Sequence, residues 1–243
     1  MPVTRIYHIA PLQADSTVTL NQRAAHHLLN VLRAGNNDPI ILFNGDDCEY
    51  QATLNINGKT VTATIHTVKN AVRESPVHIT LVQGVSRGDR MDWAIQKAVE
   101  LGVSRICPVY SQRSMKAPDD KRAEKKQQHW QGILISACEQ SGRCRLPALE
   151  TAQTLTGHLT ESKQIPAKYV LDPNASRSLP DALTAADELE ILIGPEGGLT
   201  ENEITTATGA CYQPVSLGPR ILRTETAGIA ALAIIQSRLG DLK

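Results

Sequence analysis

The stretch LIGPEGGLT, residues 192–200, is a glycine-rich bend that connects the end of an apolar run to the expected start of a helix. The run at residues 189–193 has the length and apolar character of a buried strand. Thr200 and Glu203 fit a capping box, which predicts that a helix begins directly after the bend. Three glycines within five positions let backbone atoms approach a bound molecule closely. We therefore predict a strand-to-helix bend that can hold a ligand.

A second bend of this kind follows in LGPRILRTET, residues 217–226. It comes after an expected strand at residues 215–217, and Thr224 is a natural N-cap for a helix that runs to Leu239. The alternative is that the glycines in these bends bind no ligand and only permit tight turns. Two such bends at neighbouring strand ends favour a shared pocket.

The chain from Pro76 onward alternates between apolar strands and helices. The expected strands lie at residues 77–82, 106–110, 169–171, 189–193 and 215–217, and the clearest helices at residues 89–101, 121–140 and 224–239. This alternation is typical of an α/β fold with a parallel sheet that helices cover on both faces. Ligands of such sheets bind beyond the carboxyl ends of the strands.

The first 70 residues have a different pattern. Short expected strands at residues 40–43, 50–54 and 60–65 are separated by turn clusters, and one helix at residues 22–33 interrupts the series before Gly35. This pattern predicts a small β-barrel with one helix, a type of domain that often binds nucleic acid. We place the domain boundary between residues 72 and 73, so that the domains span residues 1–72 and 73–243.

The composition excludes several classes of protein. No apolar run reaches the roughly 18 residues that a membrane span needs, and the first residues contain no signal-peptide pattern. Five cysteines without a C-x-x-C pair suit reduced thiols, so we expect a cytoplasmic protein. Seven scattered histidines without an H-E-x-x-H pattern give no metal site, and we expect none.

The charged side chains balance to zero overall but are unevenly distributed. Residues 73–150 contain 13 basic and 9 acidic side chains, an excess of +4, whereas residues 151–243 contain 7 and 11, an excess of −4. A surface that faces phosphate groups should therefore come mainly from the middle third of the chain.

The motifs leave one alternative catalytic centre. Neither glycine-rich bend is a G-x-G-x-x-G or a G-x-x-x-x-G-K-[ST], which argues against a dinucleotide fold and a P-loop enzyme. Gly84-Val85-Ser86-Arg87-Gly88 does fit the G-x-S-x-G of a serine hydrolase. Such an enzyme needs a later histidine, and the last one in this chain is His158.

Taken together, the two bends and three further segments resemble the RsmE family of 16S rRNA uridine methyltransferases, in the SPOUT superfamily. The further segments are Ser86-Arg87-Gly88, Gln96-Lys97 with Glu100-Leu101-Gly102, and residues 137–143, ACEQSGR. Arg5-Ile6-Tyr7 and Val31-Leu32-Arg33 are similar to the family's N-terminal domain, so the resemblance spans nearly the whole chain.

The resemblance implies a SPOUT domain, whose parallel sheet is tied in a deep trefoil knot, after a PUA-like β-barrel. It also implies a homodimer that takes a methyl group from S-adenosylmethionine and places it on N3 of a uridine in 16S rRNA, within the small ribosomal subunit. The broadly apolar helix at residues 224–239 would then form either the dimer face or a central core element.

The resemblance and the two bends together assign the cofactor-binding residues. The expected set is Leu171, Gly194, Glu196, Gly197, Gly198, Leu217, Gly218, Ile221, Leu222, Thr226 and Ala227. Backbone groups of the glycines would hold the adenine and the ribose, and Leu171 would close the apolar side.

Uracil N3 keeps its proton near neutral pH, so the enzyme must remove that proton or stabilise the anion left behind. Arg220 or Arg223 could hold the charge that develops on the uracil oxygens, and we favour Arg223. Glu225 and Glu196 are the candidate bases. Glu225 lies in the first turn of a helix, where the dipole stabilises a carboxylate and lowers its basicity.

The expected RNA contacts are arginines, whose planar guanidinium groups bind phosphates and stack on bases. They are Arg5, Arg33, Arg87, Arg113 and Arg143. Two other functions stay open at this point, a serine hydrolase that uses Ser86 and a non-catalytic RNA-binding protein.

Overall fold

The computed structural model describes residues 3–161 and 165–243. The chain forms two compact units. The first contains the residues up to Glu74 together with Cys138–Leu146, and the second contains Ser75–Ala137 and Pro147–Lys243. The sequence pattern did not predict that a segment from the middle of the chain joins the first unit.

The first unit is built on a five-stranded sheet with the strand order β1-β3-β4-β5-β2. Its elements are β1 (Thr4–Tyr7), β2 (Thr17–Thr19), α1 (Gln22–His26), η1 (His27–Val31), β3 (Pro39–Phe43), β4 (Cys48–Asn57) and β5 (Thr60–Asn70). β1 pairs with β3 in parallel, and the remaining pairs are antiparallel. The three expected strands are therefore present, and β4 and β5 are longer than the pattern predicted.

The core of this unit comes from the alternation of side chains along the strands. Inward-facing residues such as Leu42, Leu54 and Ile65 are fully buried and pack against Leu28 of the helical segment. The expected single helix is a short α-helix, α1, that continues into a π-helical turn, η1. It ends before Arg33, whose φ of +53° lies in the left-handed region that stops a helix.

Glu49 connects the strands of this unit to the segment from the middle of the chain. Its carboxylate accepts from the guanidinium groups of Arg5 and, at 2.7 Å, Arg73. Both arginines also donate to the carbonyl oxygen of Gly142, at 3.0 and 2.7 Å. Burial by itself would raise the pKa of Glu49, but the hydrogen bonds and charges of Arg5 and Arg73 outweigh it and lower the pKa.

The second unit contains an all-parallel sheet with the strand order β12-β10-β11-β6-β7-β8, and β9 also pairs with β7. Its strands are β6 (His78–Gly84), β7 (Arg105–Tyr110), β8 (Ala148–Leu149), β9 (Gln153–Thr154), β10 (Ala167–Leu171), β11 (Glu188–Ile193) and β12 (Gln213–Val215). Its helices are α2 (Asp89–Glu100), α3 (Asp120–Ser141, whose last turn belongs to the first unit), α4 (Leu155–Glu161), α5 (Leu179–Ala182), α6 (Glu201–Gly209) and α7 (Thr224–Leu239).

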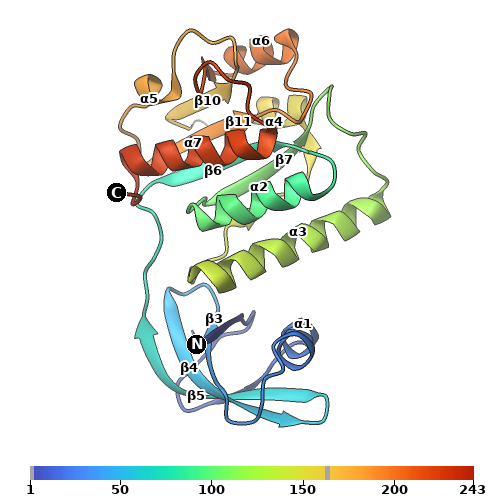
Figure 1. The fold of residues 1–243 in the computed structure, drawn as a ribbon, viewed down its shortest axis with the longest axis vertical. Coiled ribbons are helices and arrows are strands. Elements are labelled where there is room, and N and C mark those ends of the chain that lie inside the picture. The colour runs from blue at the N-terminus through green and yellow to red at the C-terminus, as the bar shows by residue number, and fades with distance from the viewer. Residues whose placement is uncertain (1–2, 162–164) are drawn as a thin grey trace. The chain divides into compact units, whose positions relative to one another are not determined.

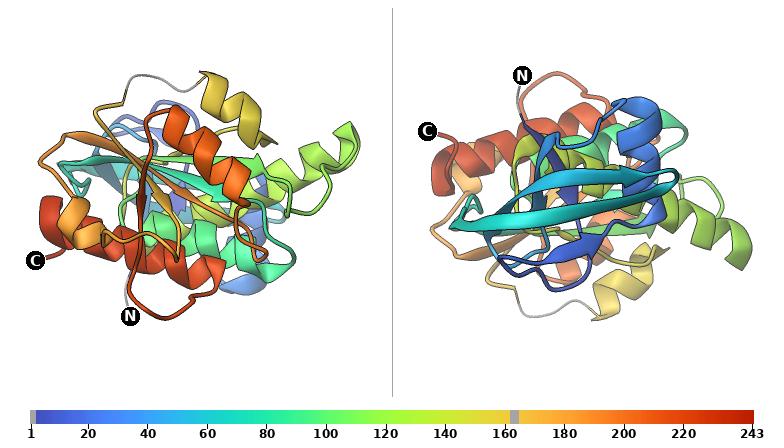
Figure 2. Two further views of the ribbon diagram at one scale, coloured as in Figure 1. Left: turned by 90° about the horizontal axis from the view of Figure 1, so that it is seen from above. Right: turned by 90° about the horizontal axis from the view of Figure 1, so that it is seen from below.

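Helices cover both faces of this sheet. α2 and α7 lie side by side on one face (Figure 1), and α4 and α6 lie on the opposite face (Figure 2). Leu155, Leu159 and Ala207 of that second face pack on the buried strand residues Val82 and Leu192. The predicted parallel α/β architecture is confirmed. The trefoil knot stays a prediction.

The last strand differs most from the expected position. It was expected at residues 215–217, whereas β12 ends at Val215. Ser216 forms a single bridge to Ser178 instead of continuing the ladder, because its amide donates to the carbonyl oxygen of Arg177, at 2.9 Å. No described helix is long and apolar enough to cross a membrane.

Replacing Glu49 by Gln should destabilise the first unit at neutral pH. The variant loses a carboxylate that binds two guanidinium groups, so we expect the free energy of unfolding to fall by about 2 kcal/mol. This loss corresponds to a roughly 30-fold lower protection of the amides from exchange. Hydrogen exchange of the β4 and β5 amides at pH 7 measures this loss, with the exposed Asp15→Asn as the matched control.

The difference between wild type and Glu49→Gln should disappear in acid. A carboxyl with a lowered folded pKa contributes stability above its unfolded pKa, and this contribution is lost as the pH falls through the folded pKa. A difference that did not shrink as the pH fell below 4.5, the ordinary value, would contradict the role assigned to Glu49.

Candidate functional site

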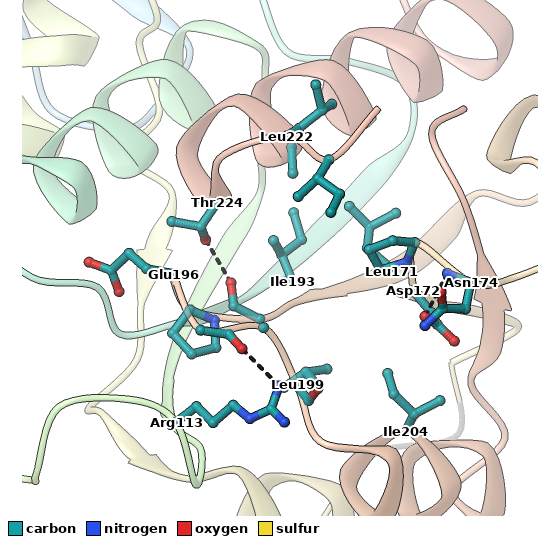
Figure 3. Close-up of a pocket in the computed structure, with 17 residues that line it drawn as sticks. Arg113, Leu171, Asp172, Asn174, Ile193, Glu196, Leu199, Ile204, Leu222 and Thr224 are labelled. Atoms are coloured by element: carbon teal, nitrogen blue, oxygen red, sulfur yellow. Dashed lines mark hydrogen bonds between the residues drawn. The ribbon is translucent and has the colours of Figure 1, made fainter. Parts of the chain in front are cut away.

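A cavity of about 330 Å³ lies between the two glycine-rich bends of the second unit (Figure 3). One wall comes from residues 193–199, which leave β11, and another from Ile221, Leu222, Thr224 and Ala227, which lead into α7. Residues 171–174, which follow β10, complete the lining together with Arg113 and Ile204. Because β10 and β11 are parallel neighbours, their carboxyl ends open onto the same edge of the sheet.

The hydroxyl of Thr224 joins the two bends. Its Oγ1 donates to the carbonyl oxygen of Gly194 over 2.6 Å (Figure 3) and accepts from Nε2 of Gln83 over 2.9 Å. Thr224 was expected to cap α7, but the N-cap residue is Arg223 and no side chain caps this end. The expectation was wrong because the hydroxyl of Thr224 is used across the site instead of on its own helix.

Gln83 is a residue that the sequence reasoning missed. It is buried at the end of β6, and the single proton of the Thr224 hydroxyl is already used on Gly194, so the amide group of Gln83 must donate to Thr224. Its own Oε1 has no hydrogen-bond partner among the described residues. A polar side chain inside the otherwise apolar run at residues 81–85 was the available signal.

Close backbone packing explains two glycines of the site. A Cβ atom on Gly194 would lie 2.9 Å from the amide nitrogen of Leu199. A Cβ atom on Gly84 would lie 2.4 Å from the backbone nitrogen of Pro195. Both distances are shorter than a carbon can approach backbone atoms, so these positions need glycine for the bend to pass β6.

The charged groups at the cavity are mostly acidic. Asp172 and Glu196 contribute carboxylates, and among the described lining residues Arg113 is the one basic side chain. Arg113 donates to the carbonyl oxygen of Gly197 over 3.0 Å (Figure 3). A cavity with this balance suits a ligand that carries positive charge better than one that carries phosphates.

Glu196 is held as a carboxylate. The amide of Arg87 donates to its Oε1 over 2.7 Å, and the guanidinium group of Arg90 donates over 2.8 Å. Burial raises the pKa of Glu196, but these hydrogen bonds and the charge of Arg90 lower it by more. The lowered pKa makes Glu196 a poor general base.

The chain matches two family models. Residues 73–236 match the RNA methyltransferase domain, and residues 20–65 match the RNA methyltransferase PUA domain. A ribosomal RNA small subunit methyltransferase E from Buchnera aphidicola is 33% identical, with 99% of this chain and 98% of the relative covered. The Bacillus subtilis protein of the same name is 32% identical, with 92% and 91% covered.

The chain belongs to the ribosomal RNA small subunit methyltransferase E family. Two solved structures are similar over their whole length. A methyltransferase from Legionella pneumophila, solved with the bound cofactor S-adenosylmethionine, has a TM-score of 0.95 at 37% identity and covers 100% of both chains. The Neisseria gonorrhoeae methyltransferase E, bound to S-adenosylmethionine, has a TM-score of 0.91 at 40% identity and covers 99% of this chain and 100% of its own.

Most of the residues that we expected to bind the cofactor lie together around this cavity. Those that line the cavity are Leu171, Gly194, Glu196, Gly197, Gly198, Ile221, Leu222 and Ala227. Leu217, Gly218 and Thr226 lie outside the lining of the described structure. The loop after β10, with Asp172 and Asn174, was missed because its sequence contains no glycine-rich signal.

The candidate catalytic residues lie at the edge of this cavity and not in its lining. Arg220 and Arg223 are exposed, at the tip of the second bend and at the N-cap of α7. Glu225 follows in the first turn of α7, and its Oε2 is buried without a hydrogen-bond partner among the described residues. A buried acceptor without a partner keeps Glu225 as the candidate base.

The five candidate RNA-binding arginines divide into two groups. Arg33, Arg87 and Arg113 are exposed. Arg143 is 5% exposed and its Nε donates to Glu74 over 3.2 Å, while Arg5 is engaged by Glu49 and the carbonyl oxygen of Gly142. The structure thus corrects the expectation for Arg5 and Arg143, because groups used to assemble the first unit are not free to bind phosphate.

Ser86 does not have the environment of a hydrolase nucleophile. It is 2% exposed, and its hydroxyl donates to the carbonyl oxygen of Gly84 over 3.3 Å. His158, the last histidine of the chain, bonds to Glu190 and Tyr212 on the far side of the sheet from α2. The described residues contain no group of three or more side chains that could hold a metal ion.

Replacing Thr224 by Val should destabilise the second unit by about 1–3 kcal/mol. The isosteric change leaves the Gly194 carbonyl and the Gln83 amide buried without their shared partner. Urea denaturation measures the free energy of unfolding, with Thr226→Val, an exposed position on the same helix, as the control. Equal stabilities of the two variants would contradict the bridging role of Thr224.

Proposed function

We propose that this chain transfers a methyl group from S-adenosylmethionine to N3 of a uridine in 16S rRNA of the small ribosomal subunit. The observation that carries the proposal is the cavity between residues 193–199 and 221–227. It lies at the carboxyl edge of a parallel sheet, in a family whose relatives from Legionella and Neisseria were solved with S-adenosylmethionine.

The lining of the cavity fits this cofactor. Backbone groups of the glycine-rich bend can hydrogen-bond to the edge of an adenine, and Ile193, Leu199 and Leu222 offer apolar contact to its faces. The carboxylate of Asp172 complements the positive sulfonium and ammonium groups of S-adenosylmethionine, whereas that of Glu196 is already paired with Arg90.

S-adenosylmethionine supplies an electrophilic methyl group, so the task of the protein is to position the uracil in line with it. We propose that Arg223, with Arg220 beside it, stabilises the negative charge on the uracil oxygens as N3 loses its proton. Glu225 would accept that proton. Its buried Oε2, which has no hydrogen-bond partner in residues 3–161 and 165–243, supports this role, and the lowered pKa of Glu196 argues against the alternative.

We propose that the substrate is the assembled small subunit and that Arg33, Arg87 and Arg113 contribute to binding it. The protein would act in the cytoplasm as a homodimer. The half-buried residues Ile229, Ala233 and Ile234 on α7 support a dimer contact on that helix. The trefoil knot would hold the two bends against each other.

Isothermal titration with S-adenosylmethionine tests the cofactor proposal. Replacing Gly194 by Ala should weaken binding at least tenfold, because the added methyl group displaces the backbone of Gly198 and Leu199. Gly209→Ala is the matched control, since a Cβ atom there meets nothing within 4 Å. A wild-type chain that binds rRNA but gives no heat with S-adenosylmethionine would instead be a non-catalytic RNA-binding protein.

Replacing Arg223 by Ala should lower kcat about a hundredfold on unmethylated small subunits, because one group that stabilises the developing oxyanion is lost. Arg223→Lys should recover part of the rate by restoring the charge without the planar fork. Arg238→Ala, on the last turn of the same helix, is the control. Unchanged turnover in Arg223→Ala would exclude this role.

A further inference from the structure

A second cavity, of about 640 Å³, lies between the end of β7 and the N-terminal half of α3. We call it the α3 cavity. Tyr110, Ala117, Pro118 and Trp130 supply most of its apolar lining, and residues 151–154 close one side. None of the residues assigned above to the cofactor, to catalysis or to RNA lines it in the described structure. Its volume is that of a site for a nucleotide-sized ligand.

The α3 cavity combines an aromatic wall with hydrogen-bonding groups. The ring of Tyr110 is half-buried, so one part of it stays accessible. Trp130 is buried, and Nζ of Lys126 lies 5.1 Å from its ring centre, so this face is already covered. Asp120 and Glu124 bring carboxylates to the lining, where they can accept hydrogen bonds from base amino groups.

Positive charge lies beside the α3 cavity, outside a lining whose own charged side chains are Asp120, Glu124 and Lys126. Residues 113–126 contain six basic and three acidic side chains, an excess of +3 in a chain whose total is zero. Lys116, Lys121 and Lys125 are exposed, and no ion pair of theirs occurs in the part of the chain that the structure describes. This arrangement favours an occupant with an apolar ring, a polar edge and a phosphate outside the cavity.

The two cavities are joined by one short segment. Tyr110 lines the α3 cavity and Arg113 lines the cofactor cavity. Three residues of extended chain span at most about 11 Å between Cα atoms, so the walls of the two cavities approach each other at this segment. A single RNA strand that places its uridine at the cofactor can reach the α3 cavity with a nearby nucleotide.

We infer that the α3 cavity receives an unstacked nucleobase of the substrate rRNA, a few nucleotides from the methylated uridine. The base stacks on Tyr110, its edge bonds to Asp120 and Glu124, and its phosphates contact Lys121 and Lys125. The site would thus fix the register of the RNA strand at the reaction centre. This inference rests on the proposed function, because it takes rRNA as the substrate.

The test fills the cavity without touching the cofactor site. Ala123 lines the α3 cavity on a helix, so Ala123→Leu adds bulk at a position that tolerates leucine. We expect at least tenfold weaker binding to unmethylated small subunits, measured in a filter assay, and unchanged binding of S-adenosylmethionine by calorimetry. Ser136→Leu, exposed on the same helix, should change neither.

A second variant tests the phosphate contacts and does not depend on packing. Lys121→Gln with Lys125→Gln should reduce the slope of log K against log salt by about 1.4, at roughly 0.7 for each phosphate contact to a single strand. Arg238→Gln with Lys243→Gln removes the same charge elsewhere and should leave the slope unchanged.

Several results would overturn the inference. Unchanged affinity of Ala123→Leu for subunits would do so, as would an unchanged salt slope in the lysine variant. An altered oligomeric mass of Ala123→Leu, with unaltered affinity for subunits, would assign the cavity to a second copy of the chain. If the wild type bound S-adenosylmethionine but no subunits, the proposed function would fail together with the inference.

Discussion

One buried hydroxyl holds the functional site of this methyltransferase together. Thr224 gives its proton to the carbonyl of Gly194 and accepts from the amide of Gln83, so three segments far apart in sequence meet at one oxygen atom. The cavity lies between the two bends that this oxygen joins. Because a buried donor or acceptor is costly to leave unpaired, the network holds the bends at a fixed separation.

Around this contact the site is built mostly from backbone. Gly84 and Gly194 let β6 and the first bend approach more closely than any side chain would allow. The charged groups that line the cavity are Asp172, Glu196 and Arg113. Positive charge lies instead on residues 113–126, beside the α3 cavity.

In the first unit, arginines hold segments of the chain together instead of binding a ligand. Arg5, Arg73 and Arg143 are used on Glu49, Glu74 and the Gly142 carbonyl, and they fix Cys138–Leu146 to the strands. Arg5 and Arg143 were expected to contact RNA. The burial of Arg143 shows that a basic motif indicates function only when its charges are not already paired inside the protein.

By itself, the sequence determined the parallel α/β unit, the preceding strand-rich unit, the positions of α2, α3 and α7, and the two glycine-rich bends. These follow from hydrophobic periodicity and turn chemistry, which are local properties of the chain. Only the tertiary structure decided that Thr224 faces Gly194 instead of capping α7, that Gln83 completes the link, and that Arg143 is buried. Such pairings depend on contacts between residues 30 to 141 positions apart, and local sequence patterns carry no record of them.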